Sequence, residues 1–290
     1  AICLSLSATC RQTFFLFCSG SWLVLLLPNP KQNRIFGGEE AKKGEFPHQV
    51  SIQIRVPILR GWRRICGGTI LSENWILTAA HCNLFNVIGQ SDARVVAGFL
   101  TLFEDDDEPT QQTAEIAEFI EHPYFHYGLP LSIQNDIALI HLATPLDLTA
   151  GPEVATAVLP SSDSDFPIFD AQARCNASGW GCPNPFSCLF GFPSNHLMWA
   201  NITAFNDDKC REVYGSSYIP EQMLCAGTYD GAHGISPGDS GGPLLCEAPD
   251  GSMVVFGVSS FSNRFWSWFA FPQVWTEINH FLDWIRETAV

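Results

Sequence analysis

Short apolar segments alternate with clusters of glycine, proline, asparagine and aspartate along most of the chain. The clearest segments are QVSIQI at 49–54, GGTILSENWILTA at 67–79, ARVVAGFL at 93–100, DIALIHL at 136–142 and MVVFGVSSF at 253–261. Short runs rich in Val, Ile and Phe that are bounded by turn residues are typical of β-strands. No segment recurs at a fixed period. The pattern predicts an all-β fold.

The last segment of the chain follows a different period. Between residues 276 and 288, apolar residues recur at the spacing of a helix rather than of a strand; they are Ile278, Phe281, Leu282 and Ile285. Such spacing places them on one face of a helix. We therefore predict a C-terminal amphipathic helix.

The first 34 residues differ again. Arg11 precedes an apolar run at 14–27, FFLFCSGSWLVLLL, which Ser19, Gly20 and Ser21 interrupt. The run is short for a membrane-spanning helix and is typical of a secretory signal peptide. An uncleaved membrane anchor is the alternative interpretation.

Charge and cysteine content narrow the class of protein. The 290 residues include 15 Lys and Arg against 30 Asp and Glu, a formal net charge of −15. This charge would repel nucleic acid and anionic membranes, so neither is expected as a partner. The 11 cysteines favour disulfides and therefore an extracellular location.

Two surface features accompany this prediction. The acidic run at Glu104–Glu108, EDDDE, has the oxygen ligands that calcium prefers, but a solvated loop is the simpler interpretation. Asn176 and Asn201 each begin an N-x-S/T sequon, which carries glycan only where it is exposed in the secretory path.

The stretch GISPGDSGGPLL at 234–245 places Ser240 among small residues. A serine hydroxyl is a weak nucleophile until a base removes its proton and N–H groups stabilise the oxyanion that attack creates. Gly238 allows a turn that aims its own N–H and that of Ser240 at one point, and Gly241 and Gly242 leave that point uncovered. We predict that Ser240 is a nucleophile and that the Gly238 and Ser240 amides form its oxyanion hole.

The base that such a serine needs is usually a histidine held by a carboxylate. His81 lies in LTAAHC, and Asp136 lies in NDIALIHL. Either motif alone would be weak, but the order His81, Asp136, Ser240 predicts a catalytic triad. The α/β-hydrolases use the motif G-x-S-x-G and the order serine, acid, histidine, and this chain lacks both. The chain also contains no HExxH motif, so the sequence does not favour a zinc enzyme.

Together with RIFGG at 34–38 and CGGTIL at 66–71, these motifs resemble the chymotrypsin-like serine proteases. The resemblance covers nearly everything after residue 34. It implies two packed six-stranded antiparallel β-barrels, with the triad in the cleft between them and a helix at the end. It divides the chain into a signal peptide and short activation propeptide, 1–34, and a protease domain, 35–290.

The resemblance also implies a mode of activation. In this family the zymogen is cut before an Ile-x-Gly-Gly sequence, and the new α-ammonium pairs with the aspartate that precedes the nucleophile. These residues correspond to Ile35 and Asp239, and Arg34 marks cleavage by a trypsin-like activator. A buried carboxylate needs a partner charge, and the pairing orders the loop that forms the oxyanion hole.

The family's cysteine pairs carry over to Cys66 with Cys82, Cys175 with Cys246, and Cys210 with Cys225. Cys182 and Cys188 lie in an insertion and would close a small local loop. Ser236 stands where the family usually has a cysteine, and the loop at 262–272 that would hold its partner contains none. We expect the missing bridge to soften the wall of the specificity pocket, and aromatic residues at 265–271 to pack in its place.

The specificity pocket is predicted to be neutral. The resemblance places Gly234, six residues before Ser240, at the floor of the pocket, so no carboxylate there would bind Lys or Arg. It also implies that Ser260, Phe261 and Ser262 line the substrate backbone and that Gln273 lies at the pocket wall. This leaves chymotrypsin-like and elastase-like preferences open. NDIALIHLATPLDLTAG, FLDWIRETAV and the glycine floor further resemble the crustacean brachyurin-like digestive proteases, which carry an acidic pocket residue where this chain has Gln273.

The sequence thus predicts a secreted, monomeric serine endopeptidase that uses no cofactor or metal. Its expected partners are protein or peptide substrates, an activating trypsin-like protease and protein inhibitors of proteases. The alternative is a non-catalytic homologue that binds a partner, which the absent pocket disulfide and the unusual Pro237 would favour.

Overall fold

The structure, a computed structural model, describes residues 15–18, 21–24, 38–55, 61–84, 92–102, 108–128, 132–161, 173–182, 193–229, 233–248, 250–262 and 272–289. The chain divides into two compact units, Ala1–Gln32 and Asn33–Val290. In the first unit, β1 (Phe15–Cys18) and β2 (Ser21–Val24) pair as an antiparallel hairpin. Among the described residues, no helix has the length and apolar character needed to cross a membrane.

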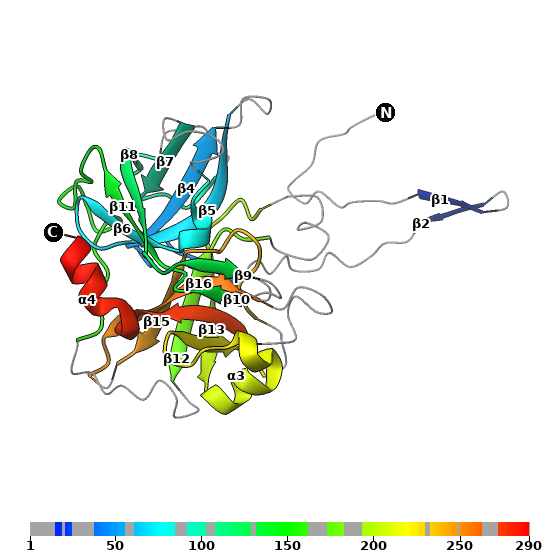
Figure 1. Ribbon diagram of the computed structural model, residues 1–290. Coiled ribbons are helices and arrows are strands. Elements are labelled where there is room, and N and C mark those ends of the chain that lie inside the picture. Colours follow the sequence, from blue (N-terminus) through cyan, green and yellow to red (C-terminus); the bar gives the residue numbers. More distant parts are fainter. Residues whose placement is uncertain are drawn as a thin grey trace. The chain divides into compact units, whose positions relative to one another are not determined.

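The larger unit begins its core with a closed antiparallel barrel, called here the first barrel (Figure 1). Its strands, in order around the barrel, are β11 (Ala138–Leu142), β6 (Trp75–Thr78), β5 (Trp62–Ile70), β4 (Gln49–Arg55), β7 (Ala93–Ala97) and β8 (Gln112–Glu121). The glycine at 68 in CGGTIL is required by this packing, because a Cβ there would lie 2.8 Å from an Ile76 methyl and 3.0 Å from a Val50 methyl.

The second barrel follows in the chain. Its strands run in the order β12 (Arg174–Gly179), β15 (Pro243–Glu247), β16 (Met253–Phe261), β17 (Gln273–Glu277), β14 (Met223–Gly227) and β13 (Met198–Phe205), and β12 pairs with β13 to close it. A short strand, β3 (Glu39–Glu40), adds to β13. A separate hairpin joins β9 (His126–Gly128) to β10 (Ser132–Gln134).

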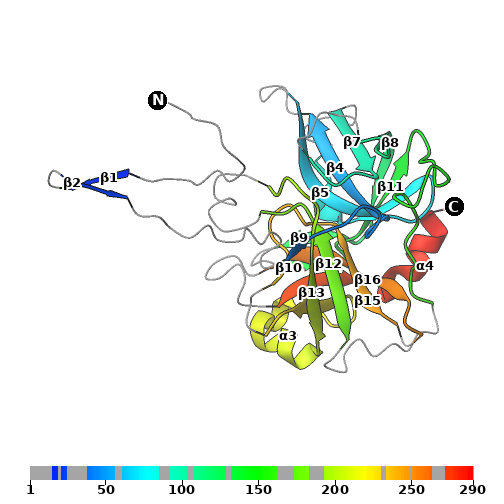
Figure 2. The same cartoon turned by 180° about the vertical axis from the view of Figure 1, so that it is seen from behind.

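The C-terminal helix joins the two barrels. Helix α4 (Ile278–Thr288) continues directly from β17 of the second barrel, yet its buried residues pack in the same apolar cluster as the interior of the first barrel; they are Ile278, Phe281, Leu282 and Ile285. Figures 1 and 2 show α4 alongside both barrels. The predicted fold, two six-stranded barrels with a C-terminal amphipathic helix, is confirmed.

The apolar pattern of the sequence did not predict helix α3 (Asp207–Tyr214), which follows β13, or the one-turn 3₁₀ helices at Ala80–Cys82 and Gly215–Ser217. The Asn206 side chain accepts a hydrogen bond from the Lys209 N–H, and two aspartates occupy the first turn. Asn followed by acidic residues is a helix-start signal, so the sequence did contain the information for this helix.

Three disulfides join residues that the structure describes: Cys66–Cys82, Cys175–Cys246 and Cys210–Cys225. These are the pairs that the family resemblance implies. The first ties β5 to the turn after β6, and the second joins β12 to β15, where the two cysteines face each other in register. The third anchors α3 to β14.

Candidate active site

His81 lies on a one-turn helix that follows strand β6 of the first barrel. The neighbouring Cys82 is bonded to Cys66 of β5, so the turn is tied to the barrel on both sides. The His81 side chain is 21% exposed, which leaves its ring in reach of a substrate. The Cys66 and Cys82 sulfurs near the ring cannot serve as thiolate ligands for a metal, because they are bonded to each other.

Asp136 is set at the start of β11 by an unusual backbone conformation. The preceding Asn135 adopts φ of +50°, in the left-handed region that Asn tolerates better than most residues. Its N–H donates to Gln222 Oε1 at 2.5 Å, and its side-chain amide donates to the Tyr124 carbonyl at 2.8 Å. Asn135 therefore fixes the direction in which the buried Asp136 carboxylate points.

The Asp136 carboxylate binds His81 through both of its oxygens. Oδ2 lies 2.7 Å from His81 Nδ1, and Oδ1 accepts the His81 backbone N–H at 2.9 Å. The Ser260 hydroxyl, from the second barrel, donates to Oδ2 at 2.5 Å. Because Nδ1 is occupied as a donor, the neutral imidazole presents Nε2 as its basic nitrogen.

These contacts also set the charge of the pair. Burial alone would raise the pKa of Asp136, but the charge of His81 and the hydrogen bonds from His81 and Ser260 outweigh it, so the pKa lies below its ordinary value. The carboxylate therefore stays ionised and can stabilise a protonated His81. Thr276 of β17 donates to the Asp136 carbonyl at 2.8 Å, a second contact from the second barrel.

Ser240 lies in a tight turn that contacts both barrels. Its carbonyl accepts the Gly67 N–H of β5 at 2.8 Å, and the next two residues exchange hydrogen bonds with Ser259 of β16 at 2.8 and 2.9 Å. The flanking Gly238 and Gly241 have φ of +101° and +76°, so glycine is needed at both positions. A Cβ at Gly241 would also collide with Thr78 Oγ1, three residues before His81.

Two backbone donors in this turn have no acceptor among the residues that the structure describes. Within the described part of the chain, neither the Gly238 N–H nor the Ser240 N–H donates a hydrogen bond. The same holds for the Ser240 hydroxyl, so its predicted bond to His81 is not formed among these residues; catalytic hydrogen bonds are often loose before substrate binds. The turn thus offers a hydroxyl and two amides to an incoming group.

Hydrogen bonding to Asp239 gives a role to Ser236, which stands where the family usually has a cysteine. Its carboxylate is 1% exposed and accepts hydrogen bonds from Gly181 N at 2.7 Å, from Ser236 N at 2.9 Å and from the Ser236 hydroxyl at 3.1 Å. Burial raises the pKa of Asp239, while Arg64 and these bonds oppose the rise. Ser236 therefore holds the turn by hydrogen bonding to Asp239.

The predicted pocket residues separate into two groups. Gln273, 1% exposed, lies across Gly234: its Oε1 accepts the Ile235 N–H at 2.9 Å, its Nε2 donates to the Ile235 carbonyl at 3.2 Å, and a Cβ on Gly234 would collide with its amide. Ser260 instead faces Asp136, because the pairing of β16 with β17 is irregular between Ser259 and Phe261.

The remaining two predicted pocket residues, Phe261 and Ser262, are half-buried at the end of β16. Several other predictions fall on residues that the structure does not describe: Arg34, Ile35, Cys188, residues 104–107 of the acidic run and the aromatic residues at 265–271. Cys182 is described and buried, with its sulfur 3.4 Å from the Pro237 carbonyl. Of the two sequon asparagines, Asn176 is half-buried and Asn201 is exposed.

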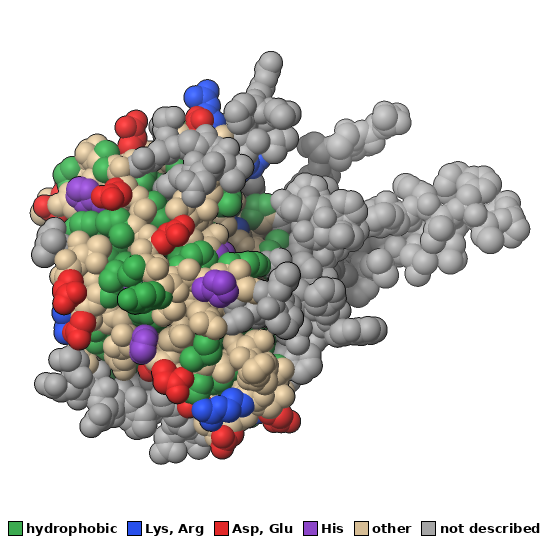
Figure 3. Space-filling model, viewed as in Figure 1, with side chains coloured by type: hydrophobic (Ala, Val, Ile, Leu, Met, Phe, Trp, Pro, Cys, Tyr) green, Lys and Arg blue, Asp and Glu red, His purple; other side chains and the backbone are tan. Residues whose placement is uncertain are grey.

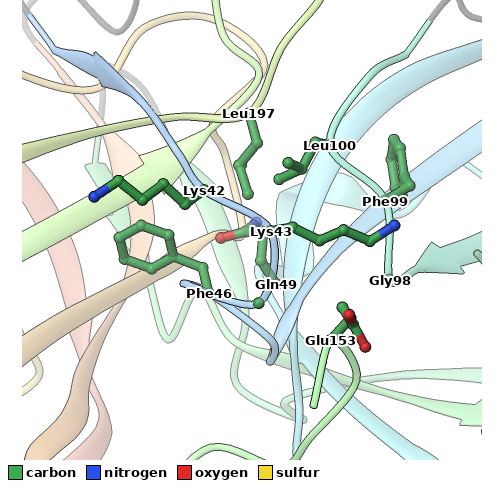
Figure 4. A pocket seen from close by; sticks show the side chains of 10 residues that line it. Lys42, Lys43, Phe46, Gln49, Gly98, Phe99, Leu100, Glu153 and Leu197 are labelled. Carbon is green, nitrogen blue, oxygen red and sulfur yellow. The ribbon is translucent and has the colours of Figure 1, made fainter. Parts of the chain in front are cut away.

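Two further hollows lie away from these residues. The pocket in Figure 4 is lined by Lys42, Lys43, Phe46, Gln49, Gly98, Phe99, Leu100, Glu153 and Leu197, and encloses only about 10 Å³, room for about one water molecule. Gln49 at its base accepts a hydrogen bond from the Ser178 hydroxyl of the second barrel at 2.7 Å. The other, of about 270 Å³, lies between Phe46, Trp199 and Met253.

Comparison with known proteins agrees with this geometry. The sequence profile of the family described as Trypsin matches residues 35–285. The chain is 31% identical to Kallikrein 1-related peptidase b3 of Mus musculus over 267 residues, which is 89% of this chain and 91% of that protein. It is 32% identical to Glandular kallikrein-10 of Rattus norvegicus, covering 89% of this chain and 90% of the relative.

The chain belongs to the trypsin family. It is a serine peptidase of that family, which confirms the prediction that the chain is a serine protease. It is also 34% identical to Transmembrane protease serine 5 of Homo sapiens over 90% of this chain, but spans only 52% of that protein's length. These relatives support the broad resemblance to serine proteases of the chymotrypsin fold. The finer resemblance to chymotrypsin- or elastase-like and brachyurin-like digestive enzymes stays a prediction.

Sequence reasoning missed the residues that hold the trypsin-family site in place. Asn135 precedes Asp136 with a left-handed backbone, Thr276 donates to the Asp136 carbonyl, and Arg64 donates to the Gly238 carbonyl. The Asn before Asp136 was a visible signal for a left-handed backbone. No sequence pattern marked Arg64 or Thr276, because both act through contacts with distant segments.

Proposed function

We propose that this trypsin-family chain is a secreted serine endopeptidase that acts through His81, Asp136 and Ser240. The observation that carries the proposal is the paired His81 and Asp136, held from both barrels beside a turn whose Gly238 and Ser240 amides donate to no described residue. On the face in Figure 3, carboxylates are spread among polar and apolar side chains, in keeping with a protein that takes peptide substrates rather than polyanions. We propose a monomer that protein inhibitors can also bind.

The catalytic steps follow from the donors and acceptors. His81 Nε2 accepts the Ser240 proton as the hydroxyl oxygen attacks the scissile carbonyl, and Asp136 stabilises the resulting imidazolium. The Gly238 and Ser240 amides bind the oxyanion of the tetrahedral intermediate. His81 then gives its proton to the leaving amine. Water, activated by the same imidazole, hydrolyses the acyl-enzyme and restores Ser240.

Activation is proposed to follow cleavage after Arg34. The family match begins at Ile35, the residue that cleavage would make the new N-terminus. Asp239 is buried and adjacent to the nucleophile, so a new ammonium group reaching it would pair with its charge and hold the turn more firmly.

The specificity pocket is proposed to accept small or medium apolar residues. Gln273 spans the floor at Gly234 and is held there by two hydrogen bonds to Ile235. A buried neutral amide offers no counter-charge to Lys or Arg, and its bulk shortens the pocket. This favours the elastase-like preference over the chymotrypsin-like one.

Replacing Gln273 by alanine is expected to deepen the pocket. The ratio of kcat/KM for substrates with Phe at the cleavage residue to that for Ala should rise about 10-fold or more, the scale set by filling or emptying an apolar pocket. Steady-state kinetics on matched peptide substrates measures it. Gln112→Ala is the matched control, since that glutamine bonds the Asp147 backbone at the surface. An unchanged ratio in Gln273→Ala would show that Gln273 does not limit the pocket.

Labelling with a fluorophosphonate tests the proposed function itself. This reagent phosphonylates serines activated by a base and an oxyanion hole. We expect chain cleaved after Arg34 to be labelled at Ser240, located by mass spectrometry of peptides, and to hydrolyse peptide bonds. Folded, correctly cleaved chain that neither labels nor hydrolyses any member of a peptide library would instead be a binding homologue.

A further inference from the structure

Arg64, on strand β5 of the first barrel, reaches into the turn that carries Ser240. Its guanidinium donates to the carbonyl oxygens of Gly238 and Trp180. The side chain as a whole is half-buried, but its Nε is buried and has no acceptor among the described residues. A Cβ on Gly238 would collide with the guanidinium. The cation therefore lies against the oxyanion-hole glycine.

Arg64 and Asp239 bind opposite ends of one peptide group. The Trp180 carbonyl accepts from Arg64, and the N–H of the same peptide unit, on Gly181, donates to Asp239 Oδ1 at 2.7 Å. A positive charge on the carbonyl side and a negative charge on the amide side polarise this peptide in the same sense, so each bond strengthens the other. The charges of Arg64 and Asp239 also attract each other directly, since Arg64 opposes the rise in the Asp239 pKa that burial causes.

The peptide of Gly238 extends this arrangement. Arg64 donates to the Gly238 carbonyl, and the N–H of the same peptide group, which belongs to Asp239, donates to the Ser236 carbonyl at 2.9 Å. On the other side, the Pro237 carbonyl accepts the Cys182 N–H at 3.3 Å. Both peptide planes that flank Gly238 are thus fixed. The direction of the Gly238 N–H, one of the two oxyanion donors, follows from them.

We propose that Arg64 is a positioning residue that supplies the positive charge beside Asp239 in the uncut chain, so that the oxyanion turn is already formed before cleavage after Arg34. This inference rests on the proposed function. Burial lowers the pKa of Arg64, and the nearby Asp239 opposes this shift. Arginine suits the task because its ordinary pKa is so high that it stays protonated, and because its planar fork can hold two carbonyls at once. Cleavage would then add a second cation to Asp239 rather than the first. The uncut chain should accordingly be a slow peptidase.

The test compares uncut and cut chains with and without this cation. Arg34→Gln prevents activation and provides the uncut form. We expect it to hydrolyse peptide substrates above the background set by Ser240→Ala, and Arg64→Gln in the same uncut chain to lower kcat about 100-fold with little change in KM, the loss expected when an oxyanion donor is misplaced. In chain cut after Arg34, Arg64→Gln should lower kcat less than about 10-fold, because the new ammonium supplies the charge.

Two further variants separate charge from packing. Arg64→Lys keeps the cation but not the fork, and should restore part of the activity that Arg64→Gln removes from the uncut chain. Arg63→Gln alters the neighbouring, exposed arginine and should leave activity unchanged. Thermal unfolding of each variant identifies any that fail to fold.

The inference is overturned if the uncut Arg34→Gln chain is no more active than Ser240→Ala, or if Arg64→Gln lowers kcat equally in uncut and cut chains, which would indicate a structural role alone. Activity of the cut wild-type chain decides the proposed function separately. Failure of one can therefore be told from failure of the other.

Discussion

Replacing Ser240 by alanine is expected to lower kcat for peptide hydrolysis by about 10⁶-fold while the chain keeps its fold. The hydroxyl makes no hydrogen bond with the described residues, so its loss leaves no buried partner unsatisfied. The remaining turnover would come from substrate binding and the Gly238 and Ser240 amides. Steady-state kinetics on chain cleaved after Arg34, with a urea unfolding curve beside it, measures both quantities.

Ser260→Ala is the matched control for this change. Ser260 also lies beside the triad, but its hydroxyl donates to Asp136 rather than facing substrate. Removing one hydrogen bond to a carboxylate that retains two others should lower kcat by only about 10-fold. If the two variants lost equal activity, or if Ser240→Ala retained most of it, Ser240 would not be the nucleophile.

Changing Asp136 to asparagine is expected to lower kcat by about 10⁴-fold at neutral pH. The amide can place an N–H where the carboxylate accepts from His81 Nδ1, which favours the wrong tautomer and removes the charge that stabilises the imidazolium. Asp147→Asn provides the control, since Asp147 is a surface residue whose carboxylate accepts hydrogen bonds from Thr149. A loss of activity in Asp147→Asn as large as that in Asp136→Asn would point to a general effect of lost charge.

The Asp136→Asn variant also tests how the free energy of unfolding depends on pH in acid. The pKa of Asp136 is lower in the folded chain than its ordinary value, so its ionised form stabilises the fold above the ordinary pKa of an aspartate, near 3.9. This contribution is lost as the pH falls through the lowered pKa. Between about pH 4 and pH 2, the free energy of unfolding should therefore fall more steeply for wild type than for Asp136→Asn, as urea titrations at each pH would measure.

The sequence was most informative where a motif fixes the local backbone. The strands at 49–54 and 253–261 and the helix after Thr276 were visible as apolar periods, and the three disulfides of the structure match the family pattern. Periodicity, however, reports which face is buried and not what touches a polar group. It could not show that Ser260 turns toward Asp136, because this depends on an irregular strand pairing.

For the same reason, the polar contacts between distant segments could not be predicted from the sequence. The resemblance placed Gln273 near the pocket. Its two hydrogen bonds to Ile235, however, depend on how the loop that contains Ile235 packs against the start of β17. Arg64 reads in the sequence as one of several basic residues before Cys66. Its place against Gly238 and Trp180 follows only from the packing of the two barrels.

The placement of helix α4 bears on how the two barrels unfold. The helix continues from β17 of the second barrel, yet Phe281 and Leu282 pack in the apolar cluster that fills the first. Loosening either barrel would therefore remove apolar contacts from the other. We expect the two barrels to lose their structure in one cooperative step rather than one after the other.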